Sequence, residues 1–273
     1  RRDARGIQAG SAEMSAMTSR TDPASARLFE KVSREAITGE HELKGIGTLG
    51  ERTLHVILKN FYETDPEFRE VKVGRYVADI KRGDQIVEIQ TRAFRNLRGK
   101  LPVFLENNAV KVVFPIAAKK YVNWVDPGSG EVTGRRKSPK SGNIWELVKE
   151  LWEIRPLMPL EGLSFDAVYL EIEEFKLLTG RSRDRKHHGA KRAERVPTGL
   201  IRIETYETAE DFASILPELP DEFTVAEFGT AAKLQNGYAG RMLATLVTLG
   251  ALENCGKRGR AYLYKKKIQS KEA

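Results

Sequence analysis

Two strand-like segments, residues 71–80 and 85–91, are separated by only four residues. The four include Gly83 and Asp84, which are residue types common in tight turns. The two segments are therefore predicted to pair as an antiparallel hairpin. This pairing restricts the fold more than any other feature, because it brings together side chains that are far apart along an extended chain.

Two acidic residues lie in this hairpin, Asp79 near the end of the first segment and Glu88 within the second. Pairing of the segments would let the two carboxylates meet near one end of a sheet. Gln90 lies two residues after Glu88, so both are expected on the same face. Two converging carboxylates with a neighbouring amide are predicted to hold magnesium or manganese, since such ions prefer oxygen ligands.

The elements around the hairpin alternate between helix and strand. Helical spacing of apolar residues predicts a helix over 49–61, and residues 94–107 are predicted to form another, with Pro102 as a first-turn residue or a kink. The predicted class is α/β with a mixed sheet flanked by helices. Further expected elements are a buried strand at 110–116, a second hairpin of 119–125 with 131–137, a helix at 143–154 and a strand at 168–175.

The chemical cluster resembles the PD-(D/E)XK nuclease superfamily, also called restriction-endonuclease-like, over residues 47–116. The resemblance implies that Asp79 and Glu88 are metal ligands and that Glu51 is the accessory acid of the first helix. It also implies hydrolysis of phosphodiester bonds with a metal-activated water.

The sequence departs from the superfamily pattern at two positions. Ala78 stands where proline usually precedes the aspartate, and Gln90 stands where lysine is usual. Glutamine can orient a water molecule but supplies no positive charge. Lys100 on the next helix is the candidate for supplying that charge. Glu51, Asp79, Glu88, Gln90 and Lys100 are thus the candidate catalytic residues.

Lysine and arginine exceed aspartate and glutamate by eight, and the isoelectric point is about 9.4. Such a surplus favours phosphate-rich partners, although a basic protein need not bind nucleic acid. Arg92, just after the acidic strand, is a candidate contact to the scissile strand. Lys119 and Lys120 are candidate phosphate contacts.

The chain is predicted to divide into four parts. Residues 1–44 are expected to be a flexible tail, with room for a short helix at 25–36, and residues 45–160 are expected to form the nuclease-like core. An extension follows at 161–216. It holds a basic loop at 181–195, whose simplest interpretation is a solvated insertion.

Residues 217–273 have the order helix, turn, helix and basic hairpin, which resembles a winged-helix domain. Its second helix would present Asn236 and Arg241 to DNA, and its hairpin would present Lys257, Arg258 and Arg260 to phosphates. Winged helices also bind proteins, so this alternative stays open. The unit is expected to have its own apolar core.

No apolar run approaches the roughly 18 residues of a membrane helix, and no secretory signal is expected. The single cysteine, Cys255, excludes a disulfide within the chain. We therefore expect a cytoplasmic protein without membrane association, and a homodimer is compatible with the sequence.

The predicted function is a metal-dependent nuclease that acts on nucleic acid, with DNA favoured, in defence or repair. The alternative is a catalytically inactive DNA-binding regulator or a scaffold that uses the winged helix. A hairpin whose acids are merely exposed would show the same residue pattern. The arrangement of Asp79, Glu88 and Gln90 distinguishes these cases.

Overall fold

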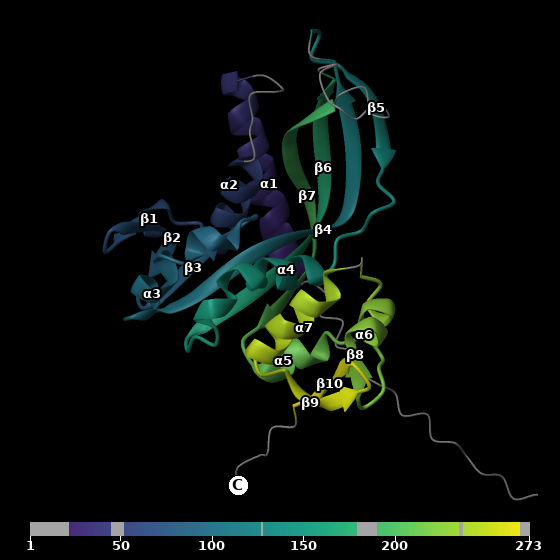
Figure 1. Cartoon of the computed structure of the whole chain (residues 1–273). Coiled ribbons are helices and arrows are strands. Elements are labelled where there is room, and N and C mark those ends of the chain that lie inside the picture. The colour runs from purple at the N-terminus through teal and green to yellow at the C-terminus, as the bar shows by residue number, and fades with distance from the viewer. Residues whose placement is uncertain (1–21, 45–51, 127, 179–189, 235–236, 268–273) are drawn as a thin grey trace, which may run out of the picture.

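A computed structural model describes residues 22–44, 52–126, 128–178, 190–234 and 237–267. These residues form a large mixed sheet with helices on both faces, which confirms the predicted α/β class (Figure 1). The strand order is β1-β2-β3-β4-β6-β7, and β5 pairs with β4. The strands are β1 (Arg69–Val73), β2 (Tyr76–Arg82), β3 (Gln85–Ile89), β4 (Ala109–Val125), β5 (Val132–Lys137), β6 (Leu163–Leu178) and β7 (Ala190–Tyr206).

Strand β4 changes its neighbour halfway along its length. Its first part pairs in parallel with β3 as far as Val113, and its last part pairs with β5 from Tyr121 onward. Pro115 lies between these two stretches. The carbonyl of Val113 accepts from Gln90 on the β3 side, and Pro115 faces the same side because alternate residues share a direction. Pro115 has no N–H to donate, and at this position β3 has already ended, so no hydrogen bond to β3 is lost. This explains how a proline is tolerated in a central strand.

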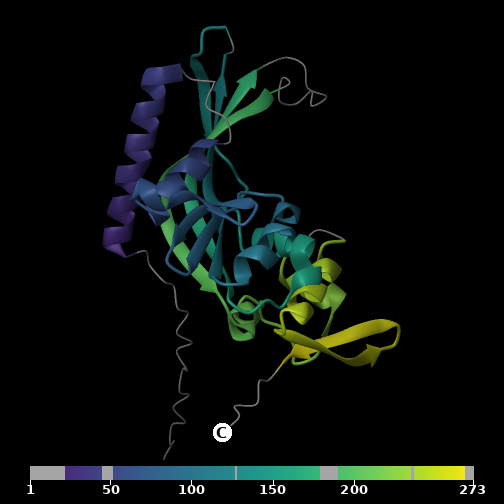
Figure 2. The same ribbon diagram turned by 90° about the vertical axis from the view of Figure 1, so that its left-hand side faces the viewer.

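Two apolar layers cover the sheet. On one face, α1 (Pro23–Lys44) and α2 (Arg52–Tyr62) bury Phe29, Leu54 and Leu58 (Figure 2). The other face is covered by η2 (Phe94–Leu97), α3 (Lys100–Leu105) and α4 (Trp145–Ile154). The main body also contains the short helical segments η1 (Pro66–Phe68), η3 (Arg155–Leu157) and α5 (Ala209–Ser214). Each face of the sheet thus has a helical cover where β2, β3 and the first half of β4 lie, whereas β5 is largely exposed.

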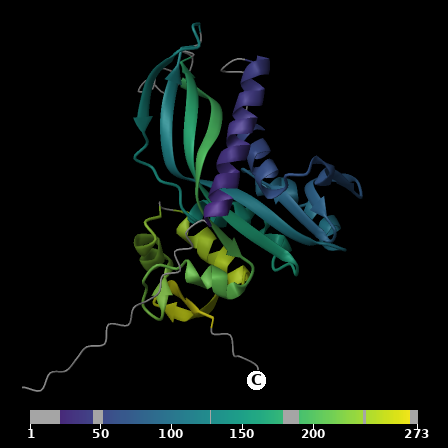
Figure 3. The ribbon, with the colours of Figure 1, turned by 180° about the vertical axis from the view of Figure 1, so that it is seen from behind.

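The N-terminal segment differs from the expected flexible tail. Residues 23–44 form α1, which runs along the back of the molecule (Figure 3). Phe29 and Val32 are buried against α2 and the sheet, so apolar burial holds the helix in place. The weak periodicity of the whole segment concealed these few apolar contacts. Residues 1–21 lie outside the described residues.

Glycines divide two of the predicted elements. The single strand expected at 71–80 is the β1–β2 hairpin, which turns at Gly74 with φ of 58°. The single helix expected at 94–107 is η2 followed by α3, and Gly99 lies between them. A β-carbon at Gly99 would lie 2.6 Å from the hydroxyl of Tyr76, so this close approach requires glycine.

The C-terminal unit begins after the proline-containing segment that follows α5. It comprises β8 (Phe223–Thr224), α6 (Val225–Ala231), α7 (Ala239–Thr248), β9 (Leu252–Arg258) and β10 (Ala261–Lys266), with strand order β8-β10-β9. The expectation of a separate apolar core is wrong. The rings of Trp145 and Phe228 are 5.3 Å apart, and one continuous apolar cluster extends from the sheet into this unit.

Two further observations concern the sequence predictions. Residues 181–189 of the expected basic loop lie outside the described residues, whereas 190–195 belong to β7. Among the described residues, no helix has both the length and the apolar character needed to cross a membrane.

Candidate functional site

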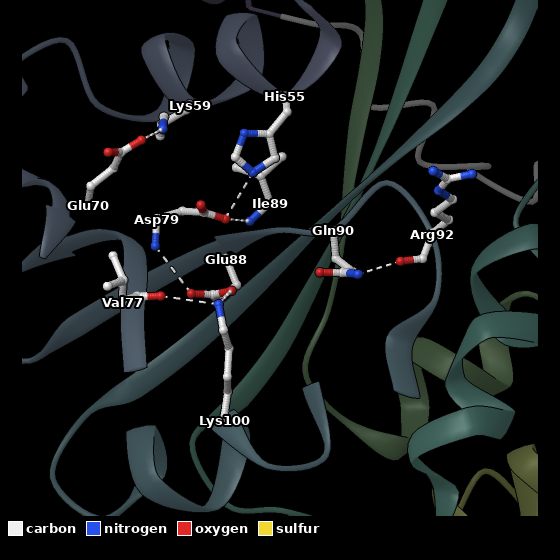
Figure 4. A network of polar contacts seen from close by, with 10 residues as sticks. All are labelled: His55, Lys59, Glu70, Val77, Asp79, Glu88, Ile89, Gln90, Arg92 and Lys100. Carbon is white, nitrogen blue, oxygen red and sulfur yellow. Dashed lines mark hydrogen bonds and ion pairs between the residues drawn. The ribbon is translucent and has the colours of Figure 1, made fainter. Parts of the chain in front are cut away.

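Asp79 and Glu88 occupy opposite positions on β2 and β3. The last backbone-paired residues are Ile80 and Val87, so the next positions outward are the two acids. There the side chains replace the backbone ladder (Figure 4). The N–H of Ile89 donates to Asp79 Oδ2 at 2.8 Å, and the N–H of Asp79 donates to Glu88 Oε1 at 3.2 Å. Each carboxylate thus satisfies a backbone donor of the opposite strand.

The Glu88 carboxylate is enclosed and paired with one cation. Only 1% of the residue is exposed, and Lys100 Nζ lies 3.0 Å from its Oε2. Burial, and then the charge of Asp79, raise the pKa of Glu88, while Lys100 acts to lower it. The structure therefore places Lys100 beside the acidic strand, where the sequence interpretation required a positive charge.

Asp79 is directed toward α2 and contacts His55. The imidazole Nε2 lies 3.2 Å from Asp79 Oδ2. Burial acts to raise the pKa of Asp79, but the hydrogen bond and charge of His55, together with the Ile89 N–H, hold the pKa below its usual value. The sequence interpretation missed His55. The signal was its position four residues after Glu51, which corresponds to one helical turn; Glu51 itself lies outside the described residues.

Glu70 is a second residue that the sequence interpretation missed. It lies on β1 beside Asp79, because Arg69 pairs with Ile80, and its φ of 54° is left-handed. This conformation costs a non-glycine residue about 1 kcal/mol or more. The Glu70 carboxylate accepts from Lys59 Nζ of α2 at 2.6 Å. A buried lysine of α2 is thereby fixed near Asp79 and His55.

The Gln90 side chain bonds to the turn that leads into η2, on the sheet face that α3 and Lys100 also cover. Its amide nitrogen donates to the carbonyl of Arg92 and, at 3.4 Å, to that of Ala93 (Figure 4). Ala93 has a left-handed φ of 57° and precedes η2. The Gln90 side chain thus stabilises the turn from β3 into η2, where short side chain-to-backbone bonds are common.

The donor chemistry at this site suits a hard divalent cation, because Asp79 and Glu88 provide carboxylate oxygens. The partners of the two carboxylates lie on opposite faces of the sheet, since Asp79 contacts His55 of α2 and Glu88 contacts Lys100 of α3. These contacts do not show the convergence predicted from the hairpin. The ligand arrangement is incomplete in this conformation. Nowhere in the described parts of the chain do three or more His, Cys, Asp or Glu side chains gather closely enough to share an ion. A divalent ion would have to take Glu88 from Lys100 and Asp79 from His55.

The candidate phosphate contacts lie in different environments. Lys119 Nζ pairs with Glu171 at 2.7 Å, and Lys120 Nζ pairs with Glu174 at 3.5 Å. Both lysines are therefore held by carboxylates of β6 and would reach phosphates only after exchanging partners. Arg92 is exposed and lines a cleft next to α4 and α7.

The basic residues of the C-terminal unit also have partners. Lys257 Nζ lies 4.7 Å from the ring centre of Tyr262, and Arg258 Nη1 pairs with Glu227 at 2.8 Å. Arg258 is the last residue of β9, and Ala261 of β10 pairs with it across a two-residue turn. Arg260 is exposed in that turn. Asn236 lies outside the described residues.

Arg241 of α7 does not project freely from the unit. Its guanidinium carbon is 5.8 Å from the ring centre of Trp152, on α4 of the main body. The neighbouring Tyr238 ring lies 5.3 Å from Lys149 Nζ, also on α4. The beginning of α7, which was expected to read DNA, thus faces the main body across a cleft.

Fold and site together define a mixed α/β protein with a buried acid–lysine pair at the end of its parallel strands. The chain belongs to the family described as "Domain of unknown function (DUF8091)", whose model matches residues 52–207, more than half of the 273 residues. It is 29% identical over 229 residues to an "Uncharacterized protein" of Treponema pallidum (strain Nichols), covering 81% of this chain and 87% of that protein. No solved structure matches the chain.

Proposed function

We propose that this protein is a metal-dependent nuclease of the PD-(D/E)XK type that hydrolyses phosphodiester bonds in DNA. One observation carries the proposal. Asp79 and Glu88 lie opposite each other on adjacent strands, and the Lys100 ammonium is 3.0 Å from Glu88. Two acids and one amine form the minimal set of charged groups that the resemblance requires. Defence and repair are the settings in which such an activity would act.

The topology around the acids supports the proposal. Helix α2 precedes the antiparallel β1–β2–β3 series, and α3 leads into β4, which is parallel to β3. The resemblance rests on the order helix, strand, strand, helix and strand, and this order differs only in that the expected first strand is divided into β1 and β2. In the resembled pattern a lysine of the acidic strand provides a positive charge, which Gln90 cannot provide. Lys100 of the next helix, α3, would provide this charge instead.

The residues of the site have distinct proposed roles. Asp79 and Glu88 would hold a magnesium or manganese ion, which when bound supplies activation of the attacking water and neutralises phosphate charge. Lys100, freed from Glu88, would stabilise negative charge developing on the phosphate. His55 orients Asp79 through its 3.2 Å contact and is a positioning residue.

The C-terminal unit supports a partner role for nucleic acid. Its order of β8, α6, α7 and the β9–β10 hairpin is that of a winged helix, and its hairpin carries Lys257, Arg258 and Arg260. These cations would contact the phosphate backbone and position the main body on DNA.

A catalytically inactive DNA-binding regulator or scaffold is the second candidate. Glu88 is almost fully enclosed, its carboxylate is bonded to Lys100 and to the Asp79 N–H, and the Gln90 amide is bonded to the turn into η2. A site whose charges neutralise one another needs no ion. This observation favours binding without chemistry.

One experiment separates the two candidates. Purified protein is incubated with supercoiled plasmid and with single-stranded DNA in magnesium, manganese or EDTA, while calorimetry measures binding of each ion. The nuclease proposal expects cleavage that needs the metal, together with binding of the ion. Absence of both, with DNA binding retained, would establish the inactive alternative instead.

A further inference from the structure

A cleft of about 330 Å³ separates α4 and η2 of the main body from α7 of the C-terminal unit. Six of its lining residues are basic or aromatic. They come from three elements that are distant in sequence, and they are Arg92, Arg95, Lys149, Trp152, Tyr238 and Arg241. Of these six residues, Arg92 and Arg241 were predicted from the sequence as nucleic-acid contacts, but in different parts of the chain.

The cleft carries a positive charge. Four of its lining side chains are basic, and two, Glu150 and Glu153, are acidic. Both acids already serve the protein itself. Glu150 Oε2 accepts from the N–H of Phe94 at 3.2 Å, and Glu153 pairs with Arg98 at 3.8 Å. The surplus of basic groups favours an anionic occupant such as a phosphate chain.

The aromatic rings alternate with these cations. Tyr238 lies next to Lys149, and Trp152 lies next to Arg241, at 5.3 and 5.8 Å between cation and ring centre. These separations approach the limit of about 6 Å at which cation–π attraction still acts. The contacts of Lys149 and Arg241 are therefore weak. Arg155 lies closer to the Trp152 ring, at 4.3 Å, so an unstacked base would take the place of Arg241 and not of Arg155 against that ring. Aromatic faces interleaved with cations are the usual composition of single-strand binding grooves.

The size and course of the cleft select a single strand. Its volume lies near the lower end of the roughly 300–1,000 Å³ of small-molecule pockets, so it accommodates about one nucleotide. An adjoining hollow shares Lys149 and Tyr238 and extends toward Lys140 and Lys233, so the path continues. A duplex keeps its bases stacked inside and could not present one to Trp152 or Tyr238 without unpairing.

We propose that this cleft binds a single-stranded segment of nucleic acid, with bases against Trp152 and Tyr238 and phosphates against Arg92 and Arg241. Arg92 lies three residues beyond the end of β3, the strand that carries Glu88, so a nucleic-acid strand that contacts Arg92 would approach the acidic pair from that end of β3 (Figure 4). Only this delivery to the acids rests on the proposed nuclease function; binding itself does not.

The test measures binding with chemistry prevented. Fluorescence anisotropy follows a short fluorescein-labelled DNA single strand, and the matching duplex, in EDTA. The full chain is compared with R92A/R241A, W152L and W152F. The control is K31A/R34A, which removes two positive charges from the exposed side of α1. Circular dichroism confirms that each variant is folded.

We expect W152L to weaken single-strand binding about tenfold, as loss of one stacking contact does, and W152F to retain most of the affinity. In R92A/R241A, the slope of log K against the logarithm of salt concentration should become shallower by about 1.4. Each of the two lost phosphate contacts contributes about 0.7 to that slope on a single strand. K31A/R34A should change neither quantity appreciably.

Equal losses in the control and cleft variants would overturn the proposal, since only total charge would then matter. Equal effects on duplex binding would also overturn it. The nuclease proposal fails separately: wild-type protein that binds the strand but does not cleave it with magnesium refutes hydrolysis and leaves the cleft intact. If the cleft variants bind the single strand as well as wild type does and still cleave it, the proposal that the cleft binds the strand is refuted and the nuclease proposal is not.

Discussion

Lys100 Nζ lies 3.0 Å from Glu88 Oε2 and 3.1 Å from the carbonyl oxygen of Val77. A single ammonium therefore joins α3 to both β2 and β3 at the point where their backbone pairing stops. Its charge has two uses that compete. It stabilises a buried carboxylate in the folded protein, and it is the group proposed to face a phosphate.

Lys100→Met tests the first use. It leaves Glu88 enclosed without its cation, so the free energy of unfolding should fall by about 2–4 kcal/mol, below the full cost of opening an enclosed pair. The expected loss is moderate because the Lys100 side chain is 29% exposed, so water already weakens its attraction to Glu88. Urea unfolding measures the change, with the exposed Lys72→Met as control. A loss no larger than in the control would show that Glu88 does not depend on Lys100.

Asp79→Asn should abolish cleavage while the protein stays folded and still binds DNA. The amide oxygen can still accept from Ile89, but one anionic ligand for the metal is lost. Plasmid cleavage in magnesium and ion binding by calorimetry measure the effect. Asp84→Asn in the exposed β2–β3 turn is the matched control. Undiminished cleavage by Asp79→Asn would remove Asp79 from the site.

The two acids should give the stability opposite dependences on pH. The pKa of Glu88 is raised in the folded protein, so the folded state binds the Glu88 proton more tightly than the unfolded state does. The contribution of Glu88 to stability therefore falls as pH rises from the pKa of the unfolded state to that of the folded state. The pKa of Asp79 is lowered, so its contribution is lost as pH falls through the folded value. The urea midpoint is therefore measured as pH is raised from about 3 to 6. Compared with wild type, Glu88→Gln should lose less stability over this range, and Asp79→Asn should gain less. Parallel curves for both variants and wild type would contradict the cited shifts.

Gln90→Ala should cost about 1 kcal/mol of stability, because the amide bonds to the turn at Arg92 and Ala93 disappear. Gln90→Lys keeps a donor for the same carbonyls and brings the residue that is usual in the resembled pattern. Its stability should match wild type, and its cleavage rate should be retained or raised. Thermal unfolding and plasmid cleavage measure the two quantities. A stable but inactive Gln90→Lys protein would mean that Lys100 cannot share its role.

Phe228→Ala should destabilise the whole chain by about 3–5 kcal/mol, since a fully buried ring is removed from the shared core. Calorimetry should show a single transition that moves to lower temperature, because the main body and the C-terminal unit meet at Trp145 and Phe228. Tyr262→Ala, at an exposed ring, is the control. Two separate transitions, with only one displaced, would show that the units unfold independently.

Local sequence pattern was sufficient where neighbouring residues determine the structure. The turn at 81–84 and the alternation that follows it predicted the β2–β3 hairpin, and the register confirms that Ile80 pairs with Val87. The position of Lys100 was also anticipated, because one short connection separates α3 from the acidic strand.

Long-range packing decided what the pattern could not. His55 contacts Asp79 because α2 lies across that face of the sheet. Its spacing from Glu51 indicates a shared helix face but does not indicate which strand residue that face meets. Strand alternation places Gln90 with Glu88, but it does not reveal that the Gln90 amide bonds to the turn into η2. The packing of α1 depends on the apolar residues Phe29 and Val32, too few to produce a clear period.

The shared core also determines which piece of this protein can be handled alone. The family's span of residues 52–207 starts after α1 and stops before β8. A fragment cut at those limits would expose the surface beneath Phe29 and the surface around Trp145 to water. Two uncovered apolar surfaces, one on the sheet and one on α4, would make such a fragment prone to aggregation. The limits of the family match are therefore unsuitable limits for an expressed fragment.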